Sequence, residues 1–339
     1  MRFMMFNRYY ILSITLLSAT LTFPLLSSVA GEPKTARVVV DVNDDAGSMT
    51  MTIDGKTALV YRYDSSVDLP HFDPFNSSSG RPMTVKITEP YPHHRSFWVA
   101  EERVHLEGQP ERAGIYNALY SGVTDKTKSK WPVAPYKRRV VHVEFSGLKT
   151  DGDLAEIDEK LTWMNGDVPL LDELRHYRVR ALDKGQYFLD FSFELRATYG
   201  NVTITRDASH YAIPYIRMND TFNVEKGKGK IVNSEAGENQ EGTHNQLATW
   251  VDYSAPLEGQ QDSEGLACFI HSSKKPPHLW LTRDYGTWGP RGPKGFHVAT
   301  FTINKGEIYD QRVGLLIHNG DAETGDVAKH YQAYCNGGL

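Results

Sequence analysis

The chain has 339 residues, of which 40% are hydrophobic and 23% charged, and its formal net charge is -5. This length suits one large domain or two modest ones. The mildly acidic balance argues against nucleic acid or an anionic membrane as the main partner.

Residues 1–30 have the pattern of an export signal. Arg2 and Arg8 precede a largely apolar run, and Ser28-Val29-Ala30 offers a small-x-small cleavage site. The run is shorter than the roughly 20 residues that a spanning helix needs. We therefore predict that residues 1–30 are a signal peptide and that residues 31–339 form a single domain. That domain is expected in the periplasm or outside the cell, with no membrane partner after cleavage.

The next segments alternate apolar and polar residues with period two, which is typical of half-buried strands. Met49–Ile53 and Ala58–Tyr63 flank Asp54-Gly55, a pair that favours tight hairpin turns. Residues 64–84 are rich in Pro, Ser and Gly, so we expect a long loop there. Residues 100–137 are charged and irregular, which predicts a second surface excursion.

Period-two alternation continues through most of the remaining chain. The pattern predicts strands at Val140–Phe145, Ile157–Trp163, Val168–Ala181, Tyr187–Arg196, Tyr211–Met218, Leu247–Val251, Gly265–His271, Leu279–Arg283, Gly295–Asn304 and Asp310–His318. One helix is expected within Gly325–Gly338, where Asp326 can cap the start and Val327, Tyr331 and Tyr334 share a stripe. The predicted fold class is all-β, a large antiparallel β-sandwich with one short C-terminal helix.

The densest set of reactive side chains is His93-His94-Arg95, just ahead of Trp98. Histidine titrates near neutral pH and is a common metal ligand, while arginine offers a fixed fork of donors for anions. In an extended strand, His93 and Arg95 would share one face and His94 the other. In a loop, both imidazoles can face one pocket. We predict catalytic roles here, with His93 or His94 as general base; the alternative is a set of hydrogen-bonded structural residues.

A second set of candidate residues lies at or beside the ends of predicted strands, where loops carry binding and catalytic groups. Asp252 or Tyr253 is predicted to assist as an acid. His271 and His318 are candidate ligands for one divalent metal ion, although no compact ligand motif such as His-Glu-x-x-His is present. Taken alone, a histidine on a half-buried strand is more often structural or solvated than catalytic.

The candidate substrate-binding residues combine flat aromatic faces with polar groups, a combination suited to sugars. They are Arg81, Trp98, His210, Arg217, Trp250 and Trp280. Tryptophan in a large β protein is also commonly a core residue. There is no Gly-x-Ser-x-Gly elbow, phosphate-binding glycine loop or Cys-x-x-Cys pair.

The chain has two cysteines, Cys268 and Cys335. In an oxidising compartment they can form a disulfide that ties the C-terminal tail to a strand. Alternatively, Cys268 is a small buried apolar residue within an apolar segment.

Several of these motifs together resemble the PmoA-like family, secreted bacterial proteins of largely uncharacterised function. The matching pieces are Ser79–Thr84, Pro92–Arg95 with Trp98, Trp250–Tyr253, Tyr285-Gly286 and His318–Gly320. The chain departs from the pattern after Arg95, where a glycine is expected, and across residues 100–120. The resemblance implies a sandwich similar to the galactose-mutarotase-like supersandwich, a fold shared by sugar epimerases, polysaccharide lyases and glycoside-processing enzymes.

The leading hypothesis is a secreted carbohydrate-active enzyme, a lyase or hydrolase acting on a glycan or glycoside. In this hypothesis Arg81 and Arg95 bind substrate oxyanions or carboxylates. The first alternative is a carbohydrate-binding protein without catalysis. The second is a metal-dependent oxygenase, because the family label refers to a methane oxygenase subunit; that subunit is an integral membrane protein, and no segment after residue 30 has the length of a membrane helix.

Overall fold

The computed structural model describes residues 37–124, 127, 129–206, 211–257 and 262–339. Contacts divide the chain into two units, residues 1–34 and 35–339, and the described residues all belong to the second. The predicted signal peptide lies outside the described residues. Within the described ranges, no helix has both the length and the apolar character needed to cross a membrane.

The described residues are mostly in β-strands. The strands are β1 Val38–Asn43, β2 Ser48–Ile53, β3 Lys56–Arg62, β4 His71–Phe75, β5 Phe97–Trp98, β6 Arg103–Leu106, β7 Gly122–Val123, β8 Val133–Tyr136, β9 Arg138–Asp151, β10 Leu154–Asn165, β11 Val168–Ala181, β12 Tyr187–Arg196, β13 Val202–Thr205, β14 Tyr215–Arg217, β15 Lys230–Asn233, β16 Leu247–Ala248, β17 Trp250–Pro256, β18 Ser263–Ile270, β19 His278–Thr282, β20 Thr287–Gly292, β21 Thr300–Ile303 and β22 Ile308–Asn319. The helices are α1 Asn239–Thr243 and α2 Val327–Cys335, and short 3-10 turns occur at Ala118–Ser121, Asp183–Gly185, Ser272–Lys274 and Phe296–Val298.

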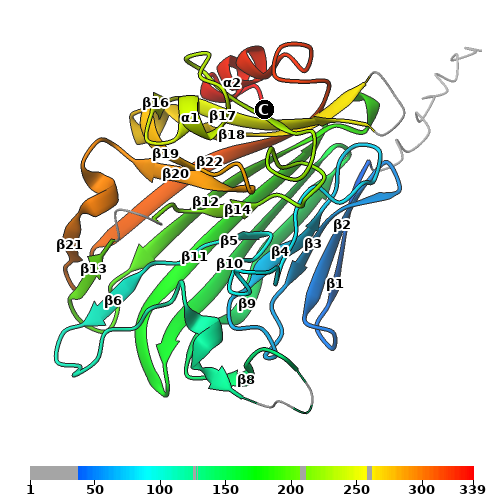
Figure 1. The fold of residues 1–339 in the computed structure, drawn as a ribbon. Coiled ribbons are helices and arrows are strands. Elements are labelled where there is room, and N and C mark those ends of the chain that lie inside the picture. The colour runs from blue at the N-terminus through cyan, green and yellow to red at the C-terminus, as the bar shows by residue number, and fades with distance from the viewer. Residues whose placement is uncertain (1–36, 125–126, 128, 207–210, 258–261) are drawn as a thin grey trace, which may run out of the picture. The chain divides into compact units, whose positions relative to one another are not determined.

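Two large antiparallel sheets dominate the fold. One has the strand order β1-β2-β3-β4-β5-β14-β20-β19-β16, and the other has the order β15-β17-β18-β22-β12-β11-β10-β9. Smaller sheets join β21-β13-β6 and β7-β8. Figure 1 shows the long strands β9 to β12, in green, running side by side, with β1 to β3, in blue, at the right of the view. The predicted all-β antiparallel fold is confirmed.

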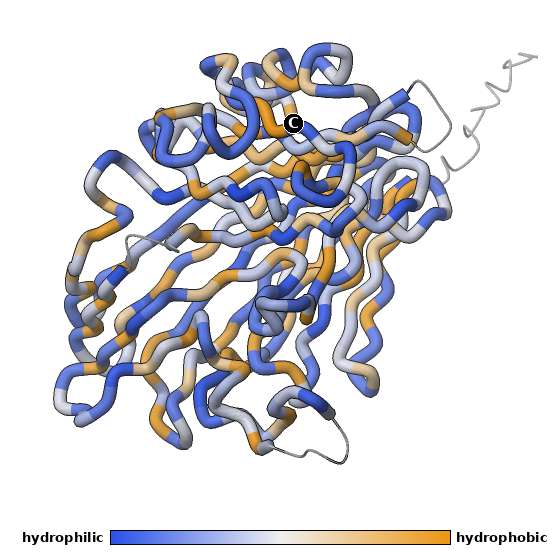
Figure 2. Tube along the Cα trace, in the orientation of Figure 1, coloured by the Kyte–Doolittle hydropathy of each residue, from blue (hydrophilic) through white to orange (hydrophobic). Residues whose placement is uncertain are grey.

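The two large sheets pack face to face through a shared apolar core. Phe97 of β5 meets Phe191 of β12 with ring centroids 5.1 Å apart, and the Tyr187 hydroxyl of β12 donates to the Asn76 carbonyl at 2.6 Å. Alternate residues of β12 and its neighbours point into this layer, so apolar and polar segments alternate along the strands in Figure 2. The predicted sandwich arrangement is therefore correct.

The N-terminal hairpin forms at the predicted turn. Asp54 and Gly55 have φ angles of 49° and 79°, the positive values that the two central positions of such a turn require. The loop expected at 64–84 is only partly correct, because it contains β4, which pairs with β3 and β5. The turn residues around β4 conceal the alternation of this short strand, although Phe72 and Phe75 are both buried.

Helix α2 covers the outer face of the second sheet. Val327, Tyr331 and Tyr334 are buried against a cluster that includes Phe188 and Phe269, as the predicted stripe requires. Asp326 does not cap the helix through its side chain, and its φ of 52° places it in the left-handed region. Cys268 and Cys335 are free thiols, Cys268 buried in the core and Cys335 half-buried.

Candidate functional site

The register of three short strands assembles the candidate site. In the first sheet β14 pairs antiparallel with both β5 and β20, so the start of β5, the end of β14 and the start of β20 meet at one end. Arg217 lies opposite Thr287, and its backbone N–H donates to the Ser96 carbonyl at 2.8 Å. The segment around His94 therefore meets residues almost 200 positions later in the chain.

A cavity of about 710 Å³ opens at this end of the sheet. It lies within the range of about 300–1,000 Å³ that is typical of small-molecule sites. The described lining residues combine aromatic rings, imidazoles, guanidiniums and a carboxylate: Tyr91, His93, His94, Glu102, Arg103, Tyr116, Asn117, Gln240, Leu281, Arg283, Tyr285 and Thr287.

His94 is buried in the cavity wall, and both of its ring nitrogens face a hydroxyl group. Its Nε2 lies 2.9 Å from the Tyr116 hydroxyl, and its Nδ1 lies 3.1 Å from the Thr287 hydroxyl. The Tyr91 ring stacks on the imidazole at 4.9 Å, and Tyr285 stacks on Tyr91 at 5.1 Å. Packing from one side and hydrogen bonds at both nitrogens fix the orientation of the ring.

The two imidazoles lie in a turn rather than in a strand. The His94 N–H donates to the Tyr91 carbonyl at 3.0 Å, which closes the turn before β5 begins. The rings of His93 and His94 lie 4.6 Å apart and both line the cavity, and His93 also meets the Tyr120 hydroxyl at 3.1 Å. The alternation expected of an extended strand is therefore wrong here, and the loop alternative is correct.

Arg217 lies directly behind the cavity wall. Its Nη1 donates to the Thr287 hydroxyl at 3.1 Å, and its guanidinium lies 4.8 Å from the centre of the Tyr285 ring. The side chain is buried, and burial lowers its pKa. Within the described ranges, no carboxylate comes within ion-pair distance of it, and its Nε has no hydrogen-bond partner.

The surroundings of two cavity phenols, Tyr116 and Tyr285, raise their pKa values. Burial raises the pKa of Tyr116 well above its usual range, and nearby Glu102 adds to this effect. Burial also raises the pKa of Tyr285. Both groups are therefore hydrogen-bond donors and weak acids at neutral pH.

Tyr285 reaches the cavity because of the glycine that follows it. Gly286 has a φ of 99°, and a Cβ at this position would lie 3.0 Å from the Met218 carbonyl oxygen. Its N–H donates to the Arg283 carbonyl at 2.7 Å, which closes a turn that presents Arg283 and Tyr285 side by side. A glycine is required where the turn is both left-handed and tightly packed.

Arg95, predicted as catalytic, supports the turn instead of lining the cavity. It is buried, and its Nη2 and Nε lie 2.5 and 3.1 Å from Asp68 Oδ1. Its Nη1 donates to the carbonyls of Pro92 and His94 at 2.9 and 3.2 Å. The guanidinium thus holds the backbone that positions both histidines.

The predicted metal pair is not brought together. His318 is fully buried, with Nε2 2.8 Å from Asp252 Oδ1, while His271 contacts Ser273 at the surface. His318 lies opposite Gly265 on β18, whereas His271 follows the other end of that strand, so the two are separated by about 20 Å of extended chain. The part of the chain that the structure describes contains no group of three side chains placed to hold a metal ion.

Asp252 and Tyr253 point to opposite faces of β17, as neighbouring strand residues do. Asp252 pairs with His318 away from the cavity lining. Tyr253 is buried behind the lining, where its hydroxyl donates to the Arg283 carbonyl at 3.0 Å and thereby supports a cavity residue. Burial raises its pKa well above the usual range.

The predicted sugar-stacking tryptophans are buried in the core rather than exposed in the cavity. Trp98 stacks on Tyr215, Trp280 donates its indole N–H to the Ala248 carbonyl at 3.0 Å, and Trp250 packs in the α2 cluster. Burying their large apolar surfaces in the sandwich interior is more favourable than exposing them in a polar cleft.

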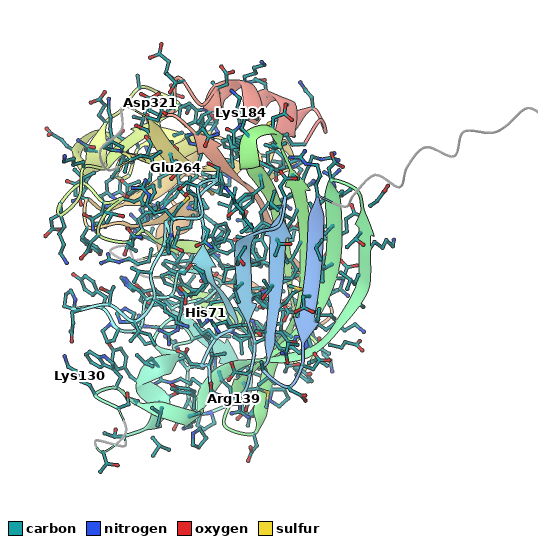
Figure 3. All side chains as sticks on the ribbon, turned by 90° about the vertical axis from the view of Figure 1, so that its right-hand side faces the viewer. His71, Lys130, Arg139, Lys184, Glu264 and Asp321 are labelled. Atoms are coloured by element: carbon teal, nitrogen blue, oxygen red, sulfur yellow. The ribbon has the colours of Figure 1, made fainter. Side chains whose placement is uncertain are left out.

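Arg81 contributes to a different part of the molecule, beside Glu264 and Phe222. Its Nε lies 3.5 Å from Glu264 Oε2, and Ser79 N–H donates to Glu264 Oε1 at 2.8 Å. Figure 3 places Glu264 and Lys184 at one end of the sandwich. The side-chain amide of Asn319 donates to the Lys184 carbonyl at 3.3 Å. His210 lies outside the described residues.

The structure adds cavity residues that the sequence pattern did not single out. They are Tyr91, Glu102, Arg103, Tyr116, Asn117, Gln240, Leu281, Arg283 and Thr287. Only Tyr285-Gly286 carried a signal, as one of the motifs behind the family resemblance. Glu102 and Tyr116 lie in the segment expected to be an irregular surface excursion.

Comparisons with known proteins identify a family without a known activity. The profile of a family of unknown function, DUF6807, matches residues 48–332. The comparisons do not show the PmoA-like family that the sequence motifs resemble. No curated protein gives a significant match.

Several solved structures resemble the fold weakly. The GH36 α-galactosidase AgaA from Geobacillus stearothermophilus has 9% identity over 85% of this chain and 41% of its own, with a TM-score of 0.42. The α-galactosidase from Lactobacillus brevis has 8% identity over 83% and 40%, with a TM-score of 0.43. Galactose 1-epimerase from Lactobacillus acidophilus NCFM has 11% identity over 84% and 98%, with a TM-score of 0.35. The chain spans about two fifths of the two galactosidases. Likenesses this weak carry no argument about activity.

Proposed function

We propose that this chain, which belongs to the family of unknown function DUF6807, is a carbohydrate-active enzyme that cleaves a glycosidic bond in the His94 cavity. One observation supports this most strongly: a buried, hydrogen-bonded His94–Tyr116 pair stands beside the stacked rings of Tyr91 and Tyr285 in one cavity. Aromatic faces bind the C–H surfaces of sugars, and the pair supplies a positioned proton.

The proposal assigns a direction to each hydrogen bond around His94. The Thr287 oxygen accepts from Arg217, and geometry alone allows its contact with His94 Nδ1 to run either way. In the proposed mechanism the Thr287 hydroxyl donates to Nδ1. His94 then carries its proton on Nε2 and donates it to the Tyr116 oxygen. The phenol hydrogen of Tyr116 is left to point into the cavity.

This arrangement suits Tyr116 to act as a general acid. Its raised pKa keeps the phenol protonated at neutral pH but also makes it a weaker acid, so the transfer depends on the His94 Nε2–H, which stabilises the oxygen as the proton leaves. In both hydrolysis and elimination the departing glycosidic oxygen takes up a proton, and Tyr116 donates it. Glu102 and His93 line the same cavity and are the candidates that accept a proton from water or from a sugar carbon.

In this mechanism Arg95 and Tyr253 support cavity residues, in place of the catalytic roles first predicted for them, and Asp252, which pairs with His318 away from the cavity, has no role. His93 and His94 keep their predicted place in the site, while Tyr116 takes the acid role first predicted for Tyr253 or Asp252. Export of the chain, a divalent metal and the supersandwich relationship implied by the PmoA-like resemblance stay predictions. Elemental analysis of protein isolated without added metal tests the metal-dependent oxygenase alternative.

The proposal is tested by incubating the full chain with a broad panel of aryl glycosides, oligosaccharides and uronate-containing glycans, with and without divalent ions. Release of a reducing end or of an unsaturated sugar from at least one substrate is expected, and it should be abolished in a His93→Gln, His94→Gln double variant. Saturable binding of a glycan with no product at any pH between about 5 and 9, the range in which histidine changes its charge, would instead establish a carbohydrate-binding protein.

A further inference from the structure

Arg217 differs from three other buried arginines in that no described carboxylate lies within ion-pair distance of its guanidinium. Those three each face a carboxylate within the protein: Arg95 with Asp68 at 2.5 Å, Arg175 with Glu173 at 2.6 Å, and Arg206 with Glu101 at 2.7 Å. A buried cation without a counter-charge is costly, because the interior solvates it poorly. In the described part of the chain, the guanidinium of Arg217 contacts a hydroxyl and an aromatic face instead.

Both of those neighbours are cavity-lining residues. Thr287 accepts the hydrogen bond from Arg217, and Tyr285 lies under the guanidinium. The positive field of Arg217 therefore extends into the cavity across a single layer of side chains, through protein that screens charge less than bulk water does.

The lining itself adds to this field. Arg103 and Arg283 both line the cavity, and Glu102 is the one carboxylate among its described lining residues. Among the described residues, the lining therefore carries two guanidiniums against one carboxylate, and behind the wall Arg217 is only partly offset by Asp220, which lies beyond ion-pair distance. An aromatic wall with an excess of positive charge selects a ligand that is both carbohydrate and anion.

We infer that the sugar bound in this cavity carries an anionic group, a carboxylate or a sulfate ester, oriented toward the wall formed by Tyr285 and Thr287 in front of Arg217. This inference rests on the proposal that the cavity binds a sugar, and it names the substrate class. Arg217 acts here through its charge and through Thr287, so it is a positioning residue for the ligand.

The test compares anionic sugars with their neutral counterparts. Affinities of the full chain are measured by calorimetry for glucuronate and galacturonate against their methyl esters, and for glucose 6-sulfate against glucose, at low and at physiological salt. Because charge pairs in a partly buried site are worth about tenfold or more in affinity, at least one anion should bind about tenfold more tightly than its neutral counterpart. The ratio should fall as salt increases.

Three variants test whether the preference for anionic sugars depends on Arg217. Arg217→Gln should bring the ratio close to one, Arg217→Lys should retain most of it, and Arg196→Gln, which removes an exposed arginine outside the cavity lining, should leave it unchanged. If Arg217→Gln does not fold, the comparison of acid and ester with the unmodified protein still decides.

The outcomes separate the two proposals. Equal affinity for acid and ester, and for sulfated and neutral glucose, overturns the anionic class even if the protein cleaves neutral glycosides. Tight binding of an anionic sugar without cleavage supports the anionic class and contradicts the proposed catalysis. Preference for the sulfate alone, or for the uronates alone, supports the anionic class and identifies which anion the site takes, and absence of binding by every sugar overturns both proposals.

Discussion

Tyr116→Phe isolates the proposed proton donor, because it removes one oxygen and keeps the ring. The ring remains packed between Tyr215, whose centroid is 4.8 Å away, and His93, at 5.0 Å. The lost hydrogen bond to His94 is 2.9 Å long, and loss of such a bond costs about 1–2 kcal/mol of unfolding free energy. A domain of this size tolerates that loss, so the variant should fold.

The expected effect on catalysis is much larger than the effect on stability. Removing a general acid lowers the rate by about 10²–10⁴-fold, which corresponds to about 3–5 kcal/mol in the barrier. The loss should appear in kcat rather than in KM, because the proton moves only in the transition state. It should shrink for an activated aryl glycoside such as a nitrophenyl glycoside, whose leaving group needs little protonation.

The assay measures kcat and KM on one poor and one good leaving group, with Tyr199→Phe as the matched control. Tyr199 is exposed, and its hydroxyl bonds Asp172 away from the cavity lining. Tyr116 is not the proton donor if Tyr116→Phe behaves like the control, or if its rate loss is the same for both leaving groups.

The remaining predictions concern stability. Thr287→Val leaves His94 Nδ1 and Arg217 Nη1 without their shared partner, so it should lower the unfolding free energy by about 2–4 kcal/mol in urea titrations. Thr287→Ser keeps the hydroxyl and should lose less than about 1 kcal/mol. Similar losses for the two variants would contradict the described hydrogen-bond chain. Burial, helped by the charges of Arg283 and Arg291, lowers the pKa of His244 to about 4. The unfolded chain, in which this imidazole has its usual pKa, therefore binds the proton more tightly. The unfolding free energy should fall as pH drops from 6.5 to 4. Because His244 is only half-buried, we expect it to account for about 1 kcal/mol of this loss, and His244→Gln should flatten the pH profile by that amount; an unchanged profile would show that other groups control it.

Local chemistry made the architecture predictable. The Asp54-Gly55 turn, the alternation along β12 and the stripe Val327, Tyr331 and Tyr334 each depend on neighbouring residues, and each appears as expected. Where turn residues interrupt the pattern, as around β4, a strand was missed because its pairing partners, not its own sequence, stabilise it.

The cavity was only half predictable. His93 and His94 stand out because reactive residue types are adjacent in sequence, but Tyr116, Arg283 and Thr287 reach them only through the register of β5, β14 and β20. Strand alternation predicts the wrong geometry at the His-His pair, because the backbone forms a turn there.

Large aromatic and charged residues were also assigned the wrong environment by residue type alone. The tryptophans lie in the core, and Arg95 pairs with a carboxylate from another loop, Asp68. The sequence shows which side chains are chemically reactive. Their burial and their hydrogen-bond partners decide whether they serve function or structure.

The central claim is that a sugar binds in the His94 cavity with its glycosidic oxygen facing Tyr116. The most direct measurement is a crystal structure of the full chain with the glycoside that binds most tightly in the panel. We predict a sugar ring against Tyr91 and Tyr285, with an oxygen about 3 Å from the Tyr116 hydroxyl. A sugar bound elsewhere, with this cavity empty, would contradict it.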